Sequence, residues 1–185
     1  MKTNEYHFIT HWRLDAPVAE VYDIIASAED LPRWWPSVYL GVNVLKEGDK
    51  SDVGKEIGLY TKGWLPYTLR WQFRVTEVKK PERLAIEAWG DFVGRGVWTF
   101  ASDGSATNVT YDWRIMADKP MLRRFSSLMK PIFSANHRWA MEKGEQSLKL
   151  ELQRRRAKTP EEASRIKRPP APTFPHNLWR KKKAT

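Results

Sequence analysis

The chain has 185 residues, no cysteine, and 32 Lys and Arg against 22 Asp and Glu, which gives a formal net charge of +10. This length allows one domain of ordinary size plus an extension, and the absence of cysteine excludes disulfides, a thiolate nucleophile and Cys-ligated zinc. The sequence shows neither a secretory signal pattern nor an apolar run of about eighteen residues, so we expect a soluble, cytoplasmic protein.

The positive charge is concentrated at the C-terminal end. Residues 154–185 carry eleven Lys and Arg and two Glu, and so hold nine of the ten net positive charges. We therefore predict a folded domain over residues 1–156 and a basic, proline-rich tail over residues 157–185. An anionic partner is expected for the tail and not for the domain.

The N-terminal region predicts one strand followed by two short helices. Residues 6–14 alternate between two faces, which is typical of a strand. Asp15-Ala16-Pro17 predicts a helix start, because Asp accepts hydrogen bonds from free amides and Pro suits the first turn. Residues 18–25 have helical spacing, and a second short helix is predicted over residues 28–34.

The middle of the chain predicts six further strands between residues 37 and 117, separated by turn residues. Residues 67–76 and residues 108–115 show the cleanest alternation of apolar and polar side chains. Such a sheet has one apolar and one solvated face, so it is antiparallel and covered on one side. The cover is predicted to be a long helix over residues 120–156, in which Pro131 marks a kink or a break.

Several short motifs occur in a characteristic order along this body. They are Ala16-Pro17-x-x-x-Val21-Tyr22, Leu31-Pro32-x-Trp34-Trp35-Pro36, Gly96-x-Trp98-x-Phe100, Asp103-Gly104-x-x-Thr107-x-Val109 and Asn136-His137-x-Trp139-Ala140-Met141-x-x-Gly144-Glu145.

With this order of elements, residues 6–156 resemble the START-like (SRPBCC) superfamily and, within it, the polyketide cyclase/dehydrase-like proteins. The resemblance implies an α+β helix-grip fold, in which a curved antiparallel seven-stranded sheet wraps round a long C-terminal helix, with two short helices after the first strand. It also implies an elongated cavity between sheet and helix that takes an apolar or aromatic small molecule. Members of the superfamily include lipid carriers, hormone receptors and ring-closing enzymes, so the fold does not choose one activity.

The ten Trp residues supply the candidate lining of such a cavity. Aromatic side chains on inward strand faces can bind a flat or hydrophobic ligand, although each can equally fill the core. The predicted ligand-binding residues are Tyr60, Trp71, Phe73, Trp98, Tyr111, Trp113, Phe133, His137 and Met141.

The candidate catalytic groups are His137, Asn136 and Tyr111. A His on the inward side of the long helix could serve as an acid or base, but more often such a His only bonds to a neighbour. No carboxylate is convincingly inside. The four His residues are too scattered for a metal site, and no phosphate-binding loop or nucleophile elbow occurs, so we expect no metal and no cofactor.

The sequence leaves three functions open. We expect binding of a hydrophobic small molecule, with a polyketide cyclase or dehydratase as the main alternative. The third is an adaptor whose basic tail holds an anionic membrane surface or nucleic acid. A short helix is predicted over residues 159–167, and the rest of the tail is either disordered or folded back on the domain through Phe174 and Trp179. No obligate protein partner is evident.

Overall fold

The computed structural model describes residues 5–117 and 126–180. The predicted start of the long helix and Phe125 therefore lie outside the described residues, as do the three lysines at positions 181–183. The side chains of Met129 and Trp179 lie outside the description as well.

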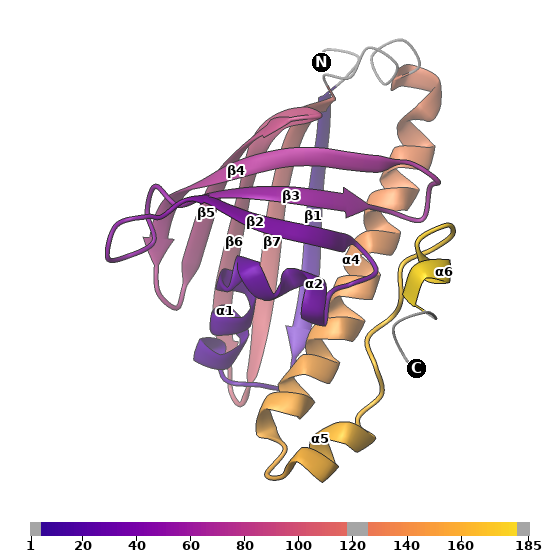
Figure 1. The fold of residues 1–185 in the computed structure, drawn as a ribbon. Helices are drawn as coiled ribbons and strands as arrows, with labels where there is room; N and C mark the ends of the chain where they lie inside the picture. The colour runs from indigo at the N-terminus through magenta and orange to yellow at the C-terminus, as the bar shows by residue number, and fades with distance from the viewer. Residues whose placement is uncertain (1–4, 118–125, 181–185) are drawn as a thin grey trace.

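Seven strands form one antiparallel sheet in the order β1-β7-β6-β5-β4-β3-β2 (Figure 1). Period-two alternation places their apolar side chains on one face, as the sequence predicted. The strands are β1 (Glu5–Leu14), β2 (Tyr39–Lys46), β3 (Glu56–Lys62), β4 (Thr68–Lys79), β5 (Arg83–Gly90), β6 (Phe92–Asp103) and β7 (Ala106–Ala117).

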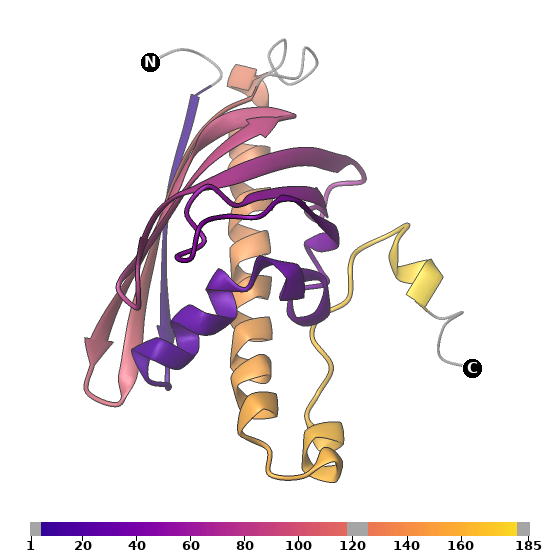
Figure 2. The same ribbon diagram turned by 60° about the vertical axis from the view of Figure 1, so that its left-hand side comes forward.

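The long helix and the short helices that follow the first strand lie on the concave side of this sheet (Figure 2). The long helix α4 (Ser126–Arg156) continues through Pro131 as one helix, so the predicted break at Pro131 does not occur. The short helices α1 (Val18–Ala26), η1 (Ala28–Asp30) and α2 (Leu31–Trp34) follow the first strand, and α5 (Pro160–Arg165) and α6 (Asn177–Arg180) belong to the tail. This is the α+β helix-grip architecture that the resemblance implied.

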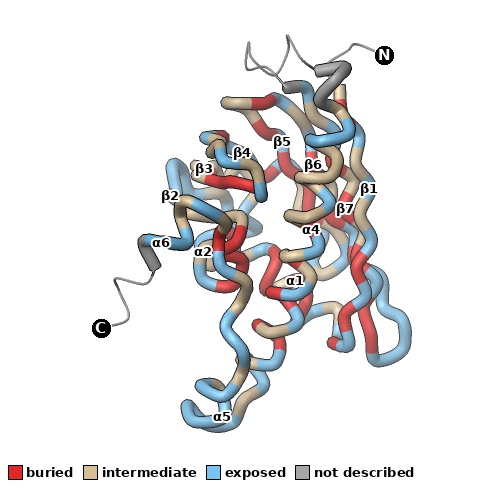
Figure 3. Tube along the Cα trace, turned by 90° about the vertical axis from the view of Figure 1, so that its right-hand side faces the viewer, coloured by how far each residue is buried: buried red, intermediate tan, exposed pale blue. Residues whose placement is uncertain are grey.

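The core lies between the concave face and the helices (Figure 3). The C-terminal half of α4 supplies the deepest contacts, with Met141, Leu148 and Leu152 buried. Ile132, an apolar residue near the N-terminal end of α4, is 36 % exposed instead. Helix α4 therefore packs most tightly near its C-terminal end.

The start of α1 differs from the prediction. Pro17 is the N-cap residue, and no side chain caps the helix. Asp15 takes another role, since its backbone carbonyl oxygen accepts a hydrogen bond from Arg156, 3.2 Å away. The segment between β1 and α1 is thus tied to the end of α4.

The described part of the tail folds back on the domain (Figures 1 and 2). Helix α5 lies within the predicted range 159–167, and its N-terminus is capped because the Thr159 hydroxyl accepts from the Glu162 amide at 3.1 Å. Beyond α5 the chain turns toward the end of β3, where Pro172 is buried and the Thr173 hydroxyl donates to the Gly63 carbonyl at 3.3 Å. Phe174 is 65 % exposed, so it is the backbone beside it that docks.

Three of the basic residues counted with the tail are paired with the domain. Arg155 and Arg154 both face Glu151, at 3.1 and 3.9 Å, and Arg156 pairs with Glu20 at 2.8 Å. These arginines form the last turn of α4. Because these three arginines already pair with carboxylates, fewer C-terminal basic residues are available to bind an anion than the sequence suggests.

Candidate functional site

A large cavity of about 870 Å³ lies between the sheet and the helices α1, η1 and α2. Its floor is apolar, because β3, β4, β5 and β6 each turn alternate side chains to the concave face. The floor residues are Ile57, Leu59, Phe73, Val75, Leu84, Ile86 and Trp98. Pockets that bind small organic molecules have about this volume and this apolar character.

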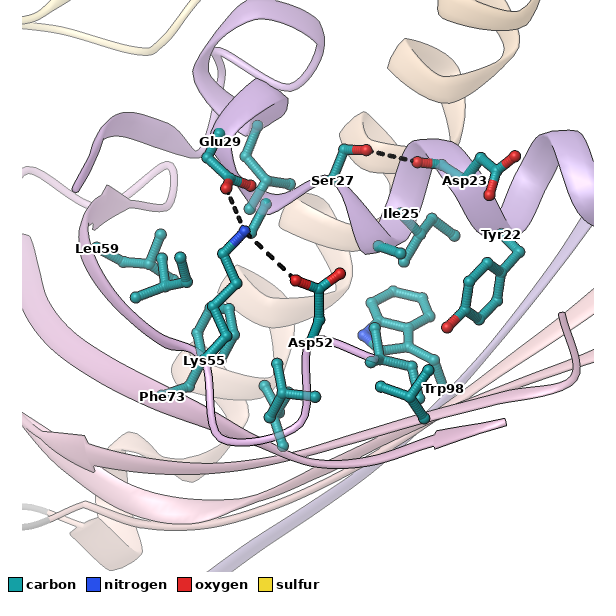
Figure 4. Close-up of a pocket in the computed structure, with 18 of the residues that line it drawn as sticks. Tyr22, Asp23, Ile25, Ser27, Glu29, Asp52, Lys55, Leu59, Phe73 and Trp98 are labelled. Carbon is teal, nitrogen blue, oxygen red and sulfur yellow. Dashed lines mark hydrogen bonds and ion pairs between the residues drawn. The ribbon is translucent and has the colours of Figure 1, made fainter. Parts of the chain in front are cut away.

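Charged side chains surround the mouth of the larger cavity (Figure 4). The Lys55 ammonium forms an ion pair with Glu29 of η1 and lies 3.8 Å from Asp52 of the β2–β3 loop. On the other side, Lys80 pairs with Asp23 of α1 at 2.7 Å. Asp52 and Lys80 are 70 % and 60 % exposed, so the cavity reaches the surface between α1, η1 and the β2–β3 loop.

A second, smaller cavity of about 170 Å³ lies between the sheet and the N-terminal half of α4. Phe133, His137 and Met141 of α4 line one side of it, and Trp113 of β7 lines another. It continues to the end of β3, where Lys62 is part of its lining.

Four aromatic residues line both cavities and form the wall between them: Trp35, Tyr39, Trp71 and Tyr111. Burial raises the pKa of both tyrosines, so their hydroxyls stay protonated. Tyr111 stacks on Trp98 with ring centroids 3.9 Å apart and on Trp113 with centroids 5.6 Å apart. Tyr111 of the wall thus lies in the middle of an aromatic stack that runs from Trp98 to Trp113 on the concave face.

Gly96 is what allows this stack to lie against β6. A Cβ atom at this position would stand 2.8 Å from the Tyr111 hydroxyl and 2.9 Å from the Trp113 ring. The motif Gly96-x-Trp98 therefore has a local physical reason: a strand residue without a side chain leaves room for two rings from the neighbouring strand.

The three candidate catalytic residues all line the smaller cavity, but no hydrogen bond links them among the described residues. The His137 ring stacks on Phe8 at 4.2 Å, and its Nε2 atom is buried without a hydrogen-bond partner among the described residues. Burial lowers the pKa of His137 to about 4, so the ring is neutral. The Asn136 side-chain oxygen accepts from the Trp64 amide at 2.9 Å and thus holds the β3–β4 turn. No hydrogen bond joins His137, Asn136 and Tyr111 in the described structure.

Eight of the nine predicted ligand-binding residues line one or both cavities. Phe73 and Trp98 belong to the larger one, Trp113, Phe133, His137 and Met141 to the smaller one, and Trp71 and Tyr111 to both.

Tyr60 is the predicted ligand-binding residue that lines neither cavity, so its prediction was wrong. It lies on the opposite face of β3, where the Arg70 guanidinium covers its ring at 4.4 Å and His176 of the tail packs beside it. Ile57, Leu59 and Thr61 occupy the inward positions of β3. Residues of opposite parity point away from the concave face.

Sequence reasoning missed two groups of residues. The charged mouth of the larger cavity comes from α1, η1 and the β2–β3 loop, and a loop lysine such as Lys55 carries no pattern that marks it. Lys62, which is 2 % exposed, was missed because a lysine at a strand end normally reaches solvent. Strand parity gave no signal for it either, because Lys62 follows the inward-facing Thr61 and so takes an outward position, yet at the end of the strand it lines the smaller cavity.

Two other kinds of site are absent from the described part of the chain. It contains no cluster of three or more His, Asp or Glu side chains placed to hold a metal ion. None of its helices is both long enough and apolar enough to cross a membrane.

Solved structures with the same fold have very different sequences. TTHA0849 from Thermus thermophilus superposes with a TM-score of 0.66 at 17 % identity, over 82 % of this chain and 100 % of its own. The ZhuI aromatase/cyclase from Streptomyces sp. R1128 gives 0.65 at 15 % identity, over 83 % of this chain and 97 % of its own. A START superfamily protein from Mycobacterium smegmatis gives 0.59 at 14 % identity, over 74 % and 94 %.

At these identities the likeness establishes the fold alone. Among curated proteins, none matches the sequence significantly. The family model "Polyketide cyclase / dehydrase and lipid transport" matches residues 14–142, which run from the end of the first strand through the short helices and the rest of the sheet to the middle of α4. The chain therefore belongs to the polyketide cyclase/dehydrase and lipid transport family.

Proposed function

We propose that this protein binds an apolar or aromatic small molecule in the larger cavity. The observation that carries the proposal is the cavity of about 870 Å³, with an apolar floor on the sheet and a charged mouth at the surface. Burying the surface of an apolar ligand there contributes roughly 25 cal/mol per Å². The charged mouth favours a ligand whose polar end remains near solvent.

The family description and the structural relatives support a ligand-binding cavity but leave the ligand open. The family description names both cyclases and lipid transport, and one of the similar structures is an aromatase/cyclase. Binding is the property that these activities share. We therefore place binding before catalysis.

The cyclase or dehydratase alternative has less support in the arrangement of polar groups. General acid–base catalysis needs groups within hydrogen-bond reach of a common substrate and pKa values near the working pH. His137 has a pKa of about 4 and is therefore a weak base at neutral pH. Asn136 is engaged by the β3–β4 turn, and Tyr111 is enclosed in the aromatic stack.

The proposal is tested with N-phenyl-1-naphthylamine, an uncharged dye that fluoresces in apolar surroundings. We expect saturable binding by the full chain. Val75→Phe adds bulk to the floor of the larger cavity and should weaken binding at least tenfold. Thr76→Phe is the matched control, because Thr76 is the next residue of β4 and is exposed on the other face. It should leave binding unchanged.

Native mass spectrometry of freshly purified protein adds the identity of a ligand. A co-purified apolar molecule that is lost in Val75→Phe and kept in Thr76→Phe would support the proposal and name the compound class. The proposal is wrong if the dye does not bind to the folded wild-type chain, or if both variants bind it as the wild type does.

A further inference from the structure

Lys62 is the most unusual charged residue in the described structure. Its side chain is 2 % exposed, and it lines the smaller cavity. The ammonium donates to two backbone carbonyls of the tail, those of Thr173 at 3.1 Å and Phe174 at 2.8 Å. No carboxylate pairs with it among the described residues.

A buried ammonium without a counter-charge is costly, and carbonyl oxygens compensate for it less well than a carboxylate does. An ammonium has three N–H donors, and the tail engages two of them. The third has no partner in the part of the chain that the structure describes. The tail passes the end of β3 (Figure 1), whose last residue is Lys62. The two carbonyl groups of the tail hold the ammonium there but leave one N–H donor and the positive charge without an anionic partner among the described residues.

The rest of the smaller cavity has the same need for a polar partner. The His137 Nε2 atom and the Tyr6 hydroxyl are both buried without a hydrogen-bond partner among residues 5–117 and 126–180. Both residues line this cavity. Buried polar atoms in native proteins nearly always have partners, so unpaired atoms that face a shared cavity point to a ligand group.

We propose that the smaller cavity binds the anionic end of an apolar ligand, with Lys62 as its cationic partner and the Thr173–Phe174 backbone as the cap that positions the ammonium. This inference rests on the proposed function and narrows its ligand class to apolar or aromatic acids. The apolar body of such a ligand would contact the ring of Phe133 and the aromatic wall shared with the larger cavity.

The test compares 4-phenylbutanoate with 4-phenylbutan-1-ol, which share the phenylalkyl body and differ in the charged end. Affinities are measured by isothermal titration calorimetry with the full chain at pH 7.5. We expect the acid to bind at least tenfold more tightly than the alcohol, because hydrogen bonds to charged groups are the strong ones.

Lys62→Met should remove this preference by weakening the acid and leaving the alcohol within about threefold. Lys50→Met is the matched control, because Lys50 lines the mouth of the larger cavity and is exposed. It should keep the preference of the wild type. Loss of the preference in Lys50→Met and not in Lys62→Met would place the anion at the other cavity and overturn the inference.

A second measurement needs no variant and holds if Lys62→Met does not fold. The preference for the acid should fall in the wild type between pH 7.5 and pH 10.5, as Lys62 loses its proton. Burial lowers the pKa of Lys62, so the loss should occur below the pH at which exposed lysines titrate. The acid itself remains ionised throughout, and a preference constant over this range contradicts the inference.

His176 and the titratable groups other than Lys62 that line the smaller cavity do not titrate in the range where we expect this change. His176 of the tail has a lowered pKa and is neutral there, and His137 across the cavity has a pKa of about 4. Burial raises the pKa of each tyrosine in the lining, and that of Tyr67 reaches about 12. The tyrosines concerned are Tyr6, Tyr39, Tyr67 and Tyr111.

The outcomes separate this inference from the proposed function. If acid and alcohol bind equally and Lys62→Met changes neither, the anionic subsite is refuted while the apolar cavity stands. If neither compound binds, the subsite is refuted, and the dye experiment with Val75→Phe decides independently whether the larger cavity binds ligand.

Discussion

Gly144 should be intolerant of a substitution that helix propensity alone would favour. It lies in the middle of α4 and is buried against Trp35. In an ordinary helix interior, Gly→Ala stabilises by about 1 kcal/mol. Here a Cβ atom would overlap the Trp35 indole and stand 2.6 Å from its Cη2 atom.

The indole has little room to move away. Trp35 is 3 % exposed and packs against Trp12, Trp34 and Tyr39, with ring centroids 5.1 to 5.7 Å apart. Overpacking a core costs typically about 1–3 kcal/mol. Set against the helix gain, Gly144→Ala should lower the free energy of unfolding by about 1 kcal/mol, or the Tm by a few degrees.

A double-mutant cycle isolates the cause. Trp35→Phe removes the ring atoms that the new methyl group would meet, at the cost of its own cavity. In that background Gly144→Ala should become neutral or stabilising by up to about 1 kcal/mol. Urea unfolding of all four proteins supplies the free energies. If Gly144→Ala stabilises the wild-type chain, or if its effect is the same in both backgrounds, the close approach of α4 and the Trp35 ring is not what limits this position.

Two further predictions concern buried titratable groups. Burial lowers the pKa of His137 from 6.5 to about 4, so the unfolded chain takes up a proton at a higher pH than the folded one. The contribution of His137 to the free energy of unfolding is therefore fully present above pH 6.5 and falls by about 3 kcal/mol as the pH drops to 4. In urea unfolding, His137→Phe should show a flatter pH dependence of stability than the wild type. Glu151 is 1 % exposed and accepts hydrogen bonds from Arg33 at 2.8 Å and Arg155 at 3.1 Å. Glu151→Gln should therefore lower the free energy of unfolding by about 2 kcal/mol. Glu145→Gln, which breaks a more exposed pair on the same helix, should cost under about 0.5 kcal/mol, and equal effects of the two variants would contradict the importance of burial.

Much of the site could be predicted from the sequence because strand parity is a local property. Residues two apart on a strand share a face, so Trp71 and Phe73 were predicted inward from their own neighbours alone. The same rule assigned Tyr111 and Trp113 to the inner face of β7. The prediction failed at Tyr60, where the short strand β3 has less regular alternation and its aromatic residue belongs to the outer face.

The sequence by itself determined the seven strands, the long helix and the composition of the apolar face, because period and turn chemistry act over a few residues. The tertiary structure alone decided that the interior is divided into two cavities by an aromatic wall, since the residues of that wall come from three separate parts of the chain. It also decided that Lys62 is buried under the tail. Contacts between residues more than a hundred positions apart depend on how the packed elements meet, and no local pattern records them.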